Sequence, residues 1–122
     1  MRVVQNINEL SMPPKYKAYL SEYLRNISDI PYISRVILFG SCARGEITKY
    51  SDIDIFVTVN REITEEEEYA LMAGRLPLYS PEANVSADIL VQYEKDFGKY
   101  IDTFGMVQKQ VNRYGVDLSE LL

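Results

Sequence analysis

Two strand-like segments, one ending in a Gly-Ser pair and one carrying an Asp-x-Asp pattern, constrain the fold of this chain most strongly. The first is apolar over residues 36–39 and ends at Gly40, which lets the backbone approach a ligand closely, and at the hydroxyl of Ser41. The second alternates in polarity, so a strand there would present Asp52 and Asp54 on the same face. Ten residues separate the Gly-Ser pair from Asp52, which leaves room for a short helical turn and a loop.

Hydrophobic periodicity predicts three helices and a third strand around these segments. The second helix has a clear start, because Thr64 and Glu67 form a capping-box pattern. We interpret its acidic residues 65–68 as a solvated, dipole-stabilised first turn, and a metal or partner surface is the alternative. In chain order we expect a helix after Pro13 and Pro14 that ends near residues 29–31, strands over 36–39 and 51–57, a helix from Thr64 to about 75–77, a loop at 77–81, a strand over 85–91, and a helix from about Tyr100 to Arg113 that uses Phe104 and Tyr114 among its apolar positions and closes at Gly115.

The order helix, strand, strand, helix, strand, helix predicts an α+β fold, with a small mixed β-sheet and helices packed against it. The chain has 122 residues and is 47% hydrophobic, which fits a single domain over residues 1–122 with one core. No apolar run approaches the roughly 20 residues that cross a bilayer. The N-terminus turns polar before a signal-peptide core could form. We therefore expect a cytoplasmic protein without a membrane partner.

The residue types that are rare in this chain exclude several kinds of site. The chain has no histidine, so it has no His-based zinc site, Ser-His triad or imidazole general base. Its single cysteine cannot form an internal disulfide. The formal net charge of -5 argues against broad binding of nucleic acid, which depends on Lys and Arg at the phosphates.

The aspartates predict a metal site. Two carboxylates two residues apart on a strand, Asp52 and Asp54, could hold one divalent cation jointly or two cations a few ångströms apart. Asp88 is an acid within the third predicted strand and would complete the site from a neighbouring strand. Mg²⁺ prefers oxygen ligands and keeps several waters, so aspartates together with triphosphate oxygens suit Mg²⁺, or Mn²⁺, better than zinc.

The Gly-Ser turn predicts a phosphate site beside these carboxylates. Gly40 allows close approach of the main chain, Ser41 and nearby N–H groups can donate to phosphate oxygens, and Arg44 lies within reach. Transfer of a nucleotidyl group mainly requires positioning and neutralisation of charge on the phosphate oxygens. Metal ions, backbone donors and an arginine supply both.

Residues 39–46 followed by residues 51–54 resemble the signature of the minimal nucleotidyltransferases, members of the DNA polymerase beta-like superfamily. That pattern is Gly-Ser, a spacer of about this length, Asp-x-Asp, and a third acid on a later strand, where Asp88 stands. The likeness extends to residues 111–118, which are similar to the usual C-terminal turn of the family. The chain departs from the pattern at Cys42, where relatives often carry a basic or larger polar residue.

The resemblance implies a role for each residue of the pattern. By it, Asp52 and Asp54 bind the metal ions, two Mg²⁺ in the expected case, and Asp88 binds one of them and acts on the nucleophile. Gly40 and Ser41 would hold the triphosphate of ATP or another NTP. The implied fold is the nucleotidyltransferase (polymerase beta-like) fold.

The implied reaction is Mg²⁺-dependent transfer of a nucleoside monophosphate, AMP from ATP, to a hydroxyl. Stand-alone minimal nucleotidyltransferases resemble the antitoxin half of toxin–antitoxin systems, whose HEPN-type RNase partner is neutralised by AMP attached to a tyrosine. This chain cannot be that RNase, because the nuclease motif requires a histidine. The alternatives are a non-catalytic nucleotide- and metal-binding module that neutralises its partner by contact, and a small-molecule nucleotidyltransferase that acts as a homo-oligomer.

Three residues near the pattern have two readings each. Arg44 either contacts phosphate or pairs with Glu46. Cys42 is interpreted as a small, partly buried residue rather than a reactive thiol. Tyr50, next to the Asp-x-Asp segment, could stack on a base or carry a modification, although most of the tyrosines fall at core spacing.

Overall fold

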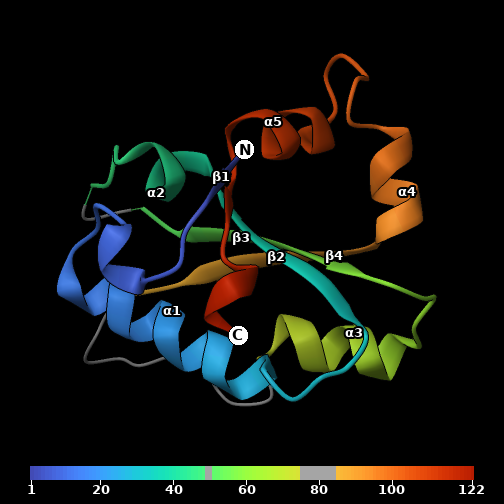
Figure 1. The fold of residues 1–122 in the computed structure, drawn as a ribbon, viewed down its shortest axis with the longest axis horizontal. Helices are drawn as coiled ribbons and strands as arrows, with labels where there is room; N and C mark the ends of the chain where they lie inside the picture. The colour runs from blue at the N-terminus through green and yellow to red at the C-terminus, as the bar shows by residue number, and fades with distance from the viewer. Residues whose placement is uncertain (49–50, 75–84) are drawn as a thin grey trace.

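The computed structural model describes residues 1–48, 51–74 and 85–122, and these form a five-stranded sheet with helices on both faces (Figure 1). The elements are β1 (Arg2–Val3), the 3₁₀-helix η1 (Ile7–Glu9), α1 (Pro14–Ile27), β2 (Ile33–Phe39), α2 (Gly40–Arg44), β3 (Ile53–Val59), α3 (Glu65–Met72), β4 (Ala87–Tyr93), α4 (Glu94–Lys99), α5 (Val107–Tyr114), β5 (Val116–Asp117) and the 3₁₀-helix η2 (Ser119–Leu121).

The sheet is mixed, with the strand order β1-β5-β2-β3-β4. β3 lies between β2, with which it pairs antiparallel, and β4, with which it pairs parallel. The two-residue strand β5 pairs antiparallel with β2, and β1 pairs parallel with β5. The N-terminal and C-terminal segments therefore lie side by side at one edge of the sheet (Figure 1).

The two faces of the sheet bury different sets of side chains because alternate residues of a strand point to opposite sides. In β3, the odd-numbered residues belong to a large core with α1 and with Leu71 of α3. Phe56 points the other way, into a smaller core with Ile37, Phe97 of α4 and Val111 of α5. In Figure 1, α1 and α3 accordingly lie on one side of the sheet and α4 and α5 on the other.

The mixed α+β fold predicted from the sequence is confirmed. α1 begins at Pro14, as the proline pair indicated. The capping box of α3 is present, since Glu67 N–H donates to Thr64 Oγ1 over 3.1 Å and Thr64 N–H donates to Glu67 Oε1 over 3.0 Å. α3 ends at Met72, before the predicted end, and the loop predicted at 77–81 and Tyr50 lie outside the described residues.

The predicted helix from Tyr100 to Arg113 is wrong in its first half. α4 ends at Lys99 and α5 starts at Val107, with a turn between them that contains Gly105 at φ 81°. Phe104, placed at a core position by the helical spacing, is 93% exposed. Gly105 adopts a left-handed conformation and interrupts the helix. The apolar periodicity seen in the sequence therefore belongs to two separate elements. The sequence pattern also did not indicate β1, β5 or α4.

None of the helices in residues 1–48, 51–74 and 85–122 is long and apolar enough to cross a membrane.

The contact between α1 and α3 yields a stability prediction. The Tyr23 hydroxyl is fully buried and donates to the Leu71 carbonyl oxygen over 2.8 Å. We expect Tyr23→Phe to lower the free energy of unfolding by about 1 kcal/mol, because a buried hydrogen bond is lost without replacement. Denaturant unfolding measures the change. Tyr69→Phe is the matched control, since Tyr69 is 73% exposed; equal effects of the two changes would contradict the prediction.

Candidate active site

The pairing of β2, β3 and β4 brings the Gly-Ser pair, the Asp-x-Asp segment and Asp88 close together. Asp54 of β3 is directly opposite Phe39 of β2 on one side and Asp88 of β4 on the other. Asp54 and Asp88 have the strand parity of Phe56, so both point to the face that carries α4 and α5. Gly40 follows Phe39 directly and starts α2. Glycine and the two carboxylates therefore meet at one end of this face.

Asp54 lies in an acidic environment. Partial burial raises the pKa of its carboxyl group above the ordinary value, and the nearby charges of Asp88 and then Asp52 raise that pKa further. The positive charge of Arg44 acts in the opposite direction. All three aspartates are thus close enough to interact electrostatically, and the ionised form of Asp54 is disfavoured until a cation compensates it.

Asp52 lies just before β3 and is exposed. Its carboxylate accepts a hydrogen bond from the hydroxyl of Ser86, and its carbonyl oxygen accepts one from the Cys42 thiol over 3.3 Å. These contacts tie the start of β3 to α2 and to the residue before β4. Within the described parts of the chain, no group of three or more His, Cys, Asp or Glu side chains is placed to hold a metal ion.

The carboxylates nevertheless fit a divalent cation as a pair. Asp54 and Asp88 are neighbours across parallel strands, and mutual repulsion of their charges with that of Asp52 contributes to the raised pKa of Asp54. Oxygen ligands of this kind suit Mg²⁺ or Mn²⁺. Asp52 lies beside this pair. Its negative charge helps to raise the pKa of Asp54, while its carboxylate accepts a hydrogen bond from Ser86.

Gly40 is required at its position by geometry. It has φ +71°, and a Cβ atom there would lie 2.3 Å from Oδ2 of Asp54. A side chain at residue 40 would therefore both strain the backbone and displace the central carboxylate. The approach of the backbone at Gly40 to a phosphate stays a prediction, and in the structure the Asp54 carboxylate lies nearest to the position of a Cβ atom at residue 40.

Ser41 and Arg44 lie in α2, which begins at Gly40 rather than after the Gly-Ser pair. The Arg44 side chain is half exposed, and its Nε donates to Glu46 Oε2 over 3.1 Å. Arg44 also acts on Asp54 through its charge. The predicted pairing with Glu46 is thus present, and the same guanidinium stands beside the carboxylates.

Cys42 is buried, as predicted for a structural residue. Burial, with smaller contributions from the charges of Asp54 and Asp52, raises the pKa of its thiol to about 11, and the hydrogen bond with Ser41 opposes the shift. The thiol is therefore protonated near neutral pH, which argues against a reactive nucleophile.

Sequence reasoning missed the residues that support the carboxylates. The buried Tyr16 of α1 donates from its hydroxyl to the Ser51 carbonyl oxygen over 3.0 Å and to that of Thr48 over 3.3 Å. This anchors the segment that leads into Asp52. Tyr16 was predicted only as a core residue. Ser86 precedes Asp88 by two residues, just as Asp52 precedes Asp54. This equal spacing is the signal that could have placed Ser86 beside Asp52.

The chain is similar to a known protein family and to a solved structure. The nucleotidyltransferase domain family model matches residues 20–120. A crystal structure of a protein from Sulfolobus solfataricus, provisionally assigned as a nucleotidyltransferase, is 30% identical to this chain; the match covers 65% of this chain and 69% of the other, with a TM-score of 0.42. None of the curated proteins compared with the chain matches it. The chain belongs to the nucleotidyltransferase domain family.

The close approach of Gly40 and Asp54 gives a prediction with a matched control. Gly40→Ala and Gly45→Ala both place a side chain at nearly the same φ, +71° and +72°, but a Cβ at Gly45 meets nothing within 4 Å. Each change should cost about 1 kcal/mol of backbone strain. We expect Gly40→Ala to cost at least about 1 kcal/mol more and to reduce transfer activity, because Asp54 must move.

Chemical denaturation and an activity assay on both variants check this prediction. Equal stability and equal activity of the two variants would show that the contact between residue 40 and Asp54 has no importance.

Proposed function

We propose that this protein is a Mg²⁺-dependent nucleotidyltransferase that moves AMP from ATP to a tyrosine hydroxyl of a HEPN-type RNase, and so acts as an antitoxin. The observation that supports catalysis is the alignment of Asp54 with Asp88 beside Gly40. The choice of AMP and of this partner follows from the resemblance to the stand-alone minimal nucleotidyltransferases. Membership of the nucleotidyltransferase domain family supports the general reaction.

In this proposal the residues of the site have separate tasks. Asp54 and Asp88, with Asp52 beside them, hold up to two Mg²⁺ or Mn²⁺ ions. When bound, the ions neutralise charge on the phosphate oxygens and favour ionisation of the attacking hydroxyl. Asp88 is the exposed member of the central pair and accepts the proton of the acceptor hydroxyl.

The phosphate chain of ATP is proposed to lie over the start of α2. Gly40 lets the backbone approach the phosphates, and the Asp54 carboxylate lies beside it, with Oδ2 only 2.3 Å from where a Cβ atom of residue 40 would be. Ser41 donates a hydroxyl hydrogen bond, and the exposed guanidinium of Arg44 supplies positive charge. The bond between the α-phosphorus and the oxygen that bridges to the β-phosphate breaks as the acceptor oxygen bonds to the α-phosphorus, and pyrophosphate leaves.

Labelled ATP tests the reaction directly. The protein, a HEPN-type RNase and Mg²⁺ are incubated with ATP labelled at the α-phosphate or at the γ-phosphate. We expect the RNase to acquire only the α-label and to lose nuclease activity. Asp54→Ala and Asp88→Ala should each reduce labelling by about 10²-fold or more, because charge stabilisation at the phosphates is lost. Asp96→Ala is the control, since Asp96 forms an exposed pair with Lys99.

Other outcomes of this experiment identify the alternatives. Transfer of the γ-label would indicate phosphoryl transfer and contradict the proposal. Unlabelled but inhibited RNase, with no effect of Asp54→Ala, would establish neutralisation by contact. Labelling of aminoglycoside-like acceptors in the absence of any partner would establish a small-molecule enzyme.

Thermal unfolding supplies a second test that needs no acceptor. Saturating Mg²⁺ and ATP at about 100 times the dissociation constant should raise Tm by about 5–10 °C. Asp54→Asn should abolish this increase and raise Tm of the metal-free protein by about 1–3 °C. The fold disfavours the ionised carboxyl at this position, as its raised pKa indicates, so removing the charge relieves repulsion. An unchanged metal-free Tm would contradict the electrostatic argument.

A further inference from the structure

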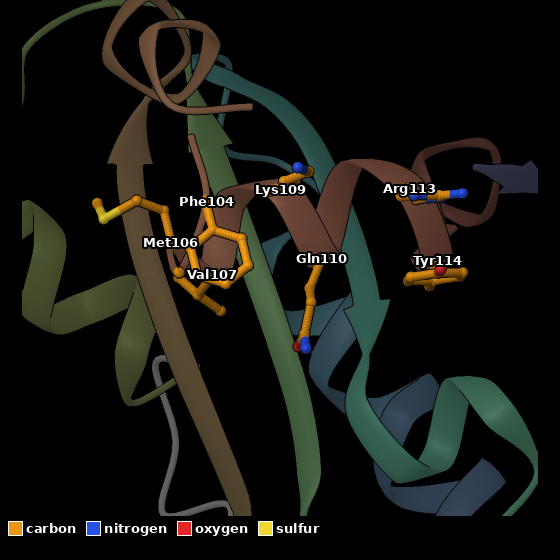
Figure 2. Close-up of a pocket in the computed structure, with 8 residues that line it drawn as sticks. Phe104, Met106, Val107, Lys109, Gln110, Arg113 and Tyr114 are labelled. Carbon is orange, nitrogen blue, oxygen red and sulfur yellow. The ribbon is translucent and has the colours of Figure 1, made fainter. Parts of the chain in front are cut away.

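A pocket of about 480 Å³ lies along α5 and the turn before it, outside the residues of the family pattern (Figure 2). Its aromatic residues are Phe104, 93% exposed, and Tyr114, 61% exposed. Gln110 lies between them in the chain and is also exposed. In Figure 2 the side chains of Gln110 and Tyr114 extend from the same side of α5. Two exposed rings and an amide on one short stretch are not explained by packing.

This pocket continues into the candidate active site. A second pocket of about 190 Å³ is lined by Phe39, Gly40, Arg44, Gln110 and Tyr114. Gln110 and Tyr114 thus belong to both pockets, and Gly40 and Arg44 are the residues proposed to hold phosphate. α5 packs against both α2 and β2, which fixes this arrangement. A ligand whose phosphates lie over Gly40 would reach α5 with its other end.

The charge of the two pockets fits a polyanion although the chain as a whole is acidic. The formal net charge is -5, yet among the residues that the structure describes, the lining of these pockets includes Lys109, Arg113 and Arg44 and no carboxylate. The Arg113 guanidinium lies 5.3 Å from the centre of the Tyr114 ring, a cation–π contact that places positive charge beside this ring.

We infer that α5 forms the nucleoside subsite of this protein, with the base of the nucleotide stacked on Tyr114 and hydrogen-bonded by the Gln110 amide. This inference rests on the proposed function, because it uses the triphosphate position at Gly40. The aromatic face supplies stacking, which every base can use, and the amide supplies a donor and an acceptor for the base edge. Phe104 also lines this pocket.

Calorimetric binding of Mg·ATP and of Mg·tripolyphosphate separates this subsite from the phosphate site. Tyr114→Ala should weaken binding of Mg·ATP by about tenfold or more and leave binding of tripolyphosphate unchanged, because the latter has no base to stack. Tyr114→Phe should restore ATP affinity to within about threefold of the parent, since it keeps the ring. Tyr69→Ala removes an exposed tyrosine from α3 and should change neither ligand.

The outcomes distinguish the subsite from the proposed reaction. Unchanged ATP affinity in Tyr114→Ala, with transfer still abolished by Asp54→Ala, overturns the subsite and leaves the reaction standing. Equal weakening of ATP and tripolyphosphate also overturns the subsite, because the ring would then act on the phosphate region. A raised KM for the acceptor at unchanged ATP affinity would assign the pocket to the acceptor instead. Absence of any Mg·ATP binding by the parent protein overturns both proposals.

Discussion

The parallel pairing of β3 with β4 is the constraint on which the rest of the site depends. Asp54 and Asp88 come from segments separated by α3, and only the register between the two strands places them side by side. A shift of one residue would turn Asp88 to the opposite face, where Ile89 is buried in the large core. The apolar pattern of β4 therefore fixes the position of the Asp88 carboxylate.

The antiparallel partner of β3 completes the site at the same place. β2 ends opposite Asp54, and the backbone then turns at Gly40 so closely that a Cβ atom would meet the Asp54 carboxylate. The chain thus holds an acidic residue in a partly buried and like-charged environment, as the raised pKa of Asp54 shows. The large core on the other face supplies the packing that such a site needs, including six buried side chains of α1.

The sequence predicted those parts of the fold whose signal is local. The periodicity of α1, the capping box of α3 and the apolar runs of β2, β3 and β4 each lie within one continuous segment, and these elements are present. β1 and β5 have two residues each and exist because distant segments pair. So short a strand has no period to detect. The Asp-x-Asp and Gly-Ser pattern likewise located one side of the site, while Tyr16 and Ser86 depend on tertiary contacts.

The difference between the two faces of the sheet explains why the exposure of Tyr114 on α5 was not predicted from the sequence. The face toward α1 is filled by a continuous core, whereas the buried core of the face toward α5 consists of Ile37, Phe56, Phe97 and Val111. Helical spacing marked Tyr114 as one more core position, yet its ring is 61% exposed beside Gly40 and Arg44. An apolar residue that recurs at helical spacing on the buried face of a helix normally packs into the core. Tyr114, at the end of α5, instead lines a pocket with Phe39, Gly40 and Arg44, so its ring stays at the surface.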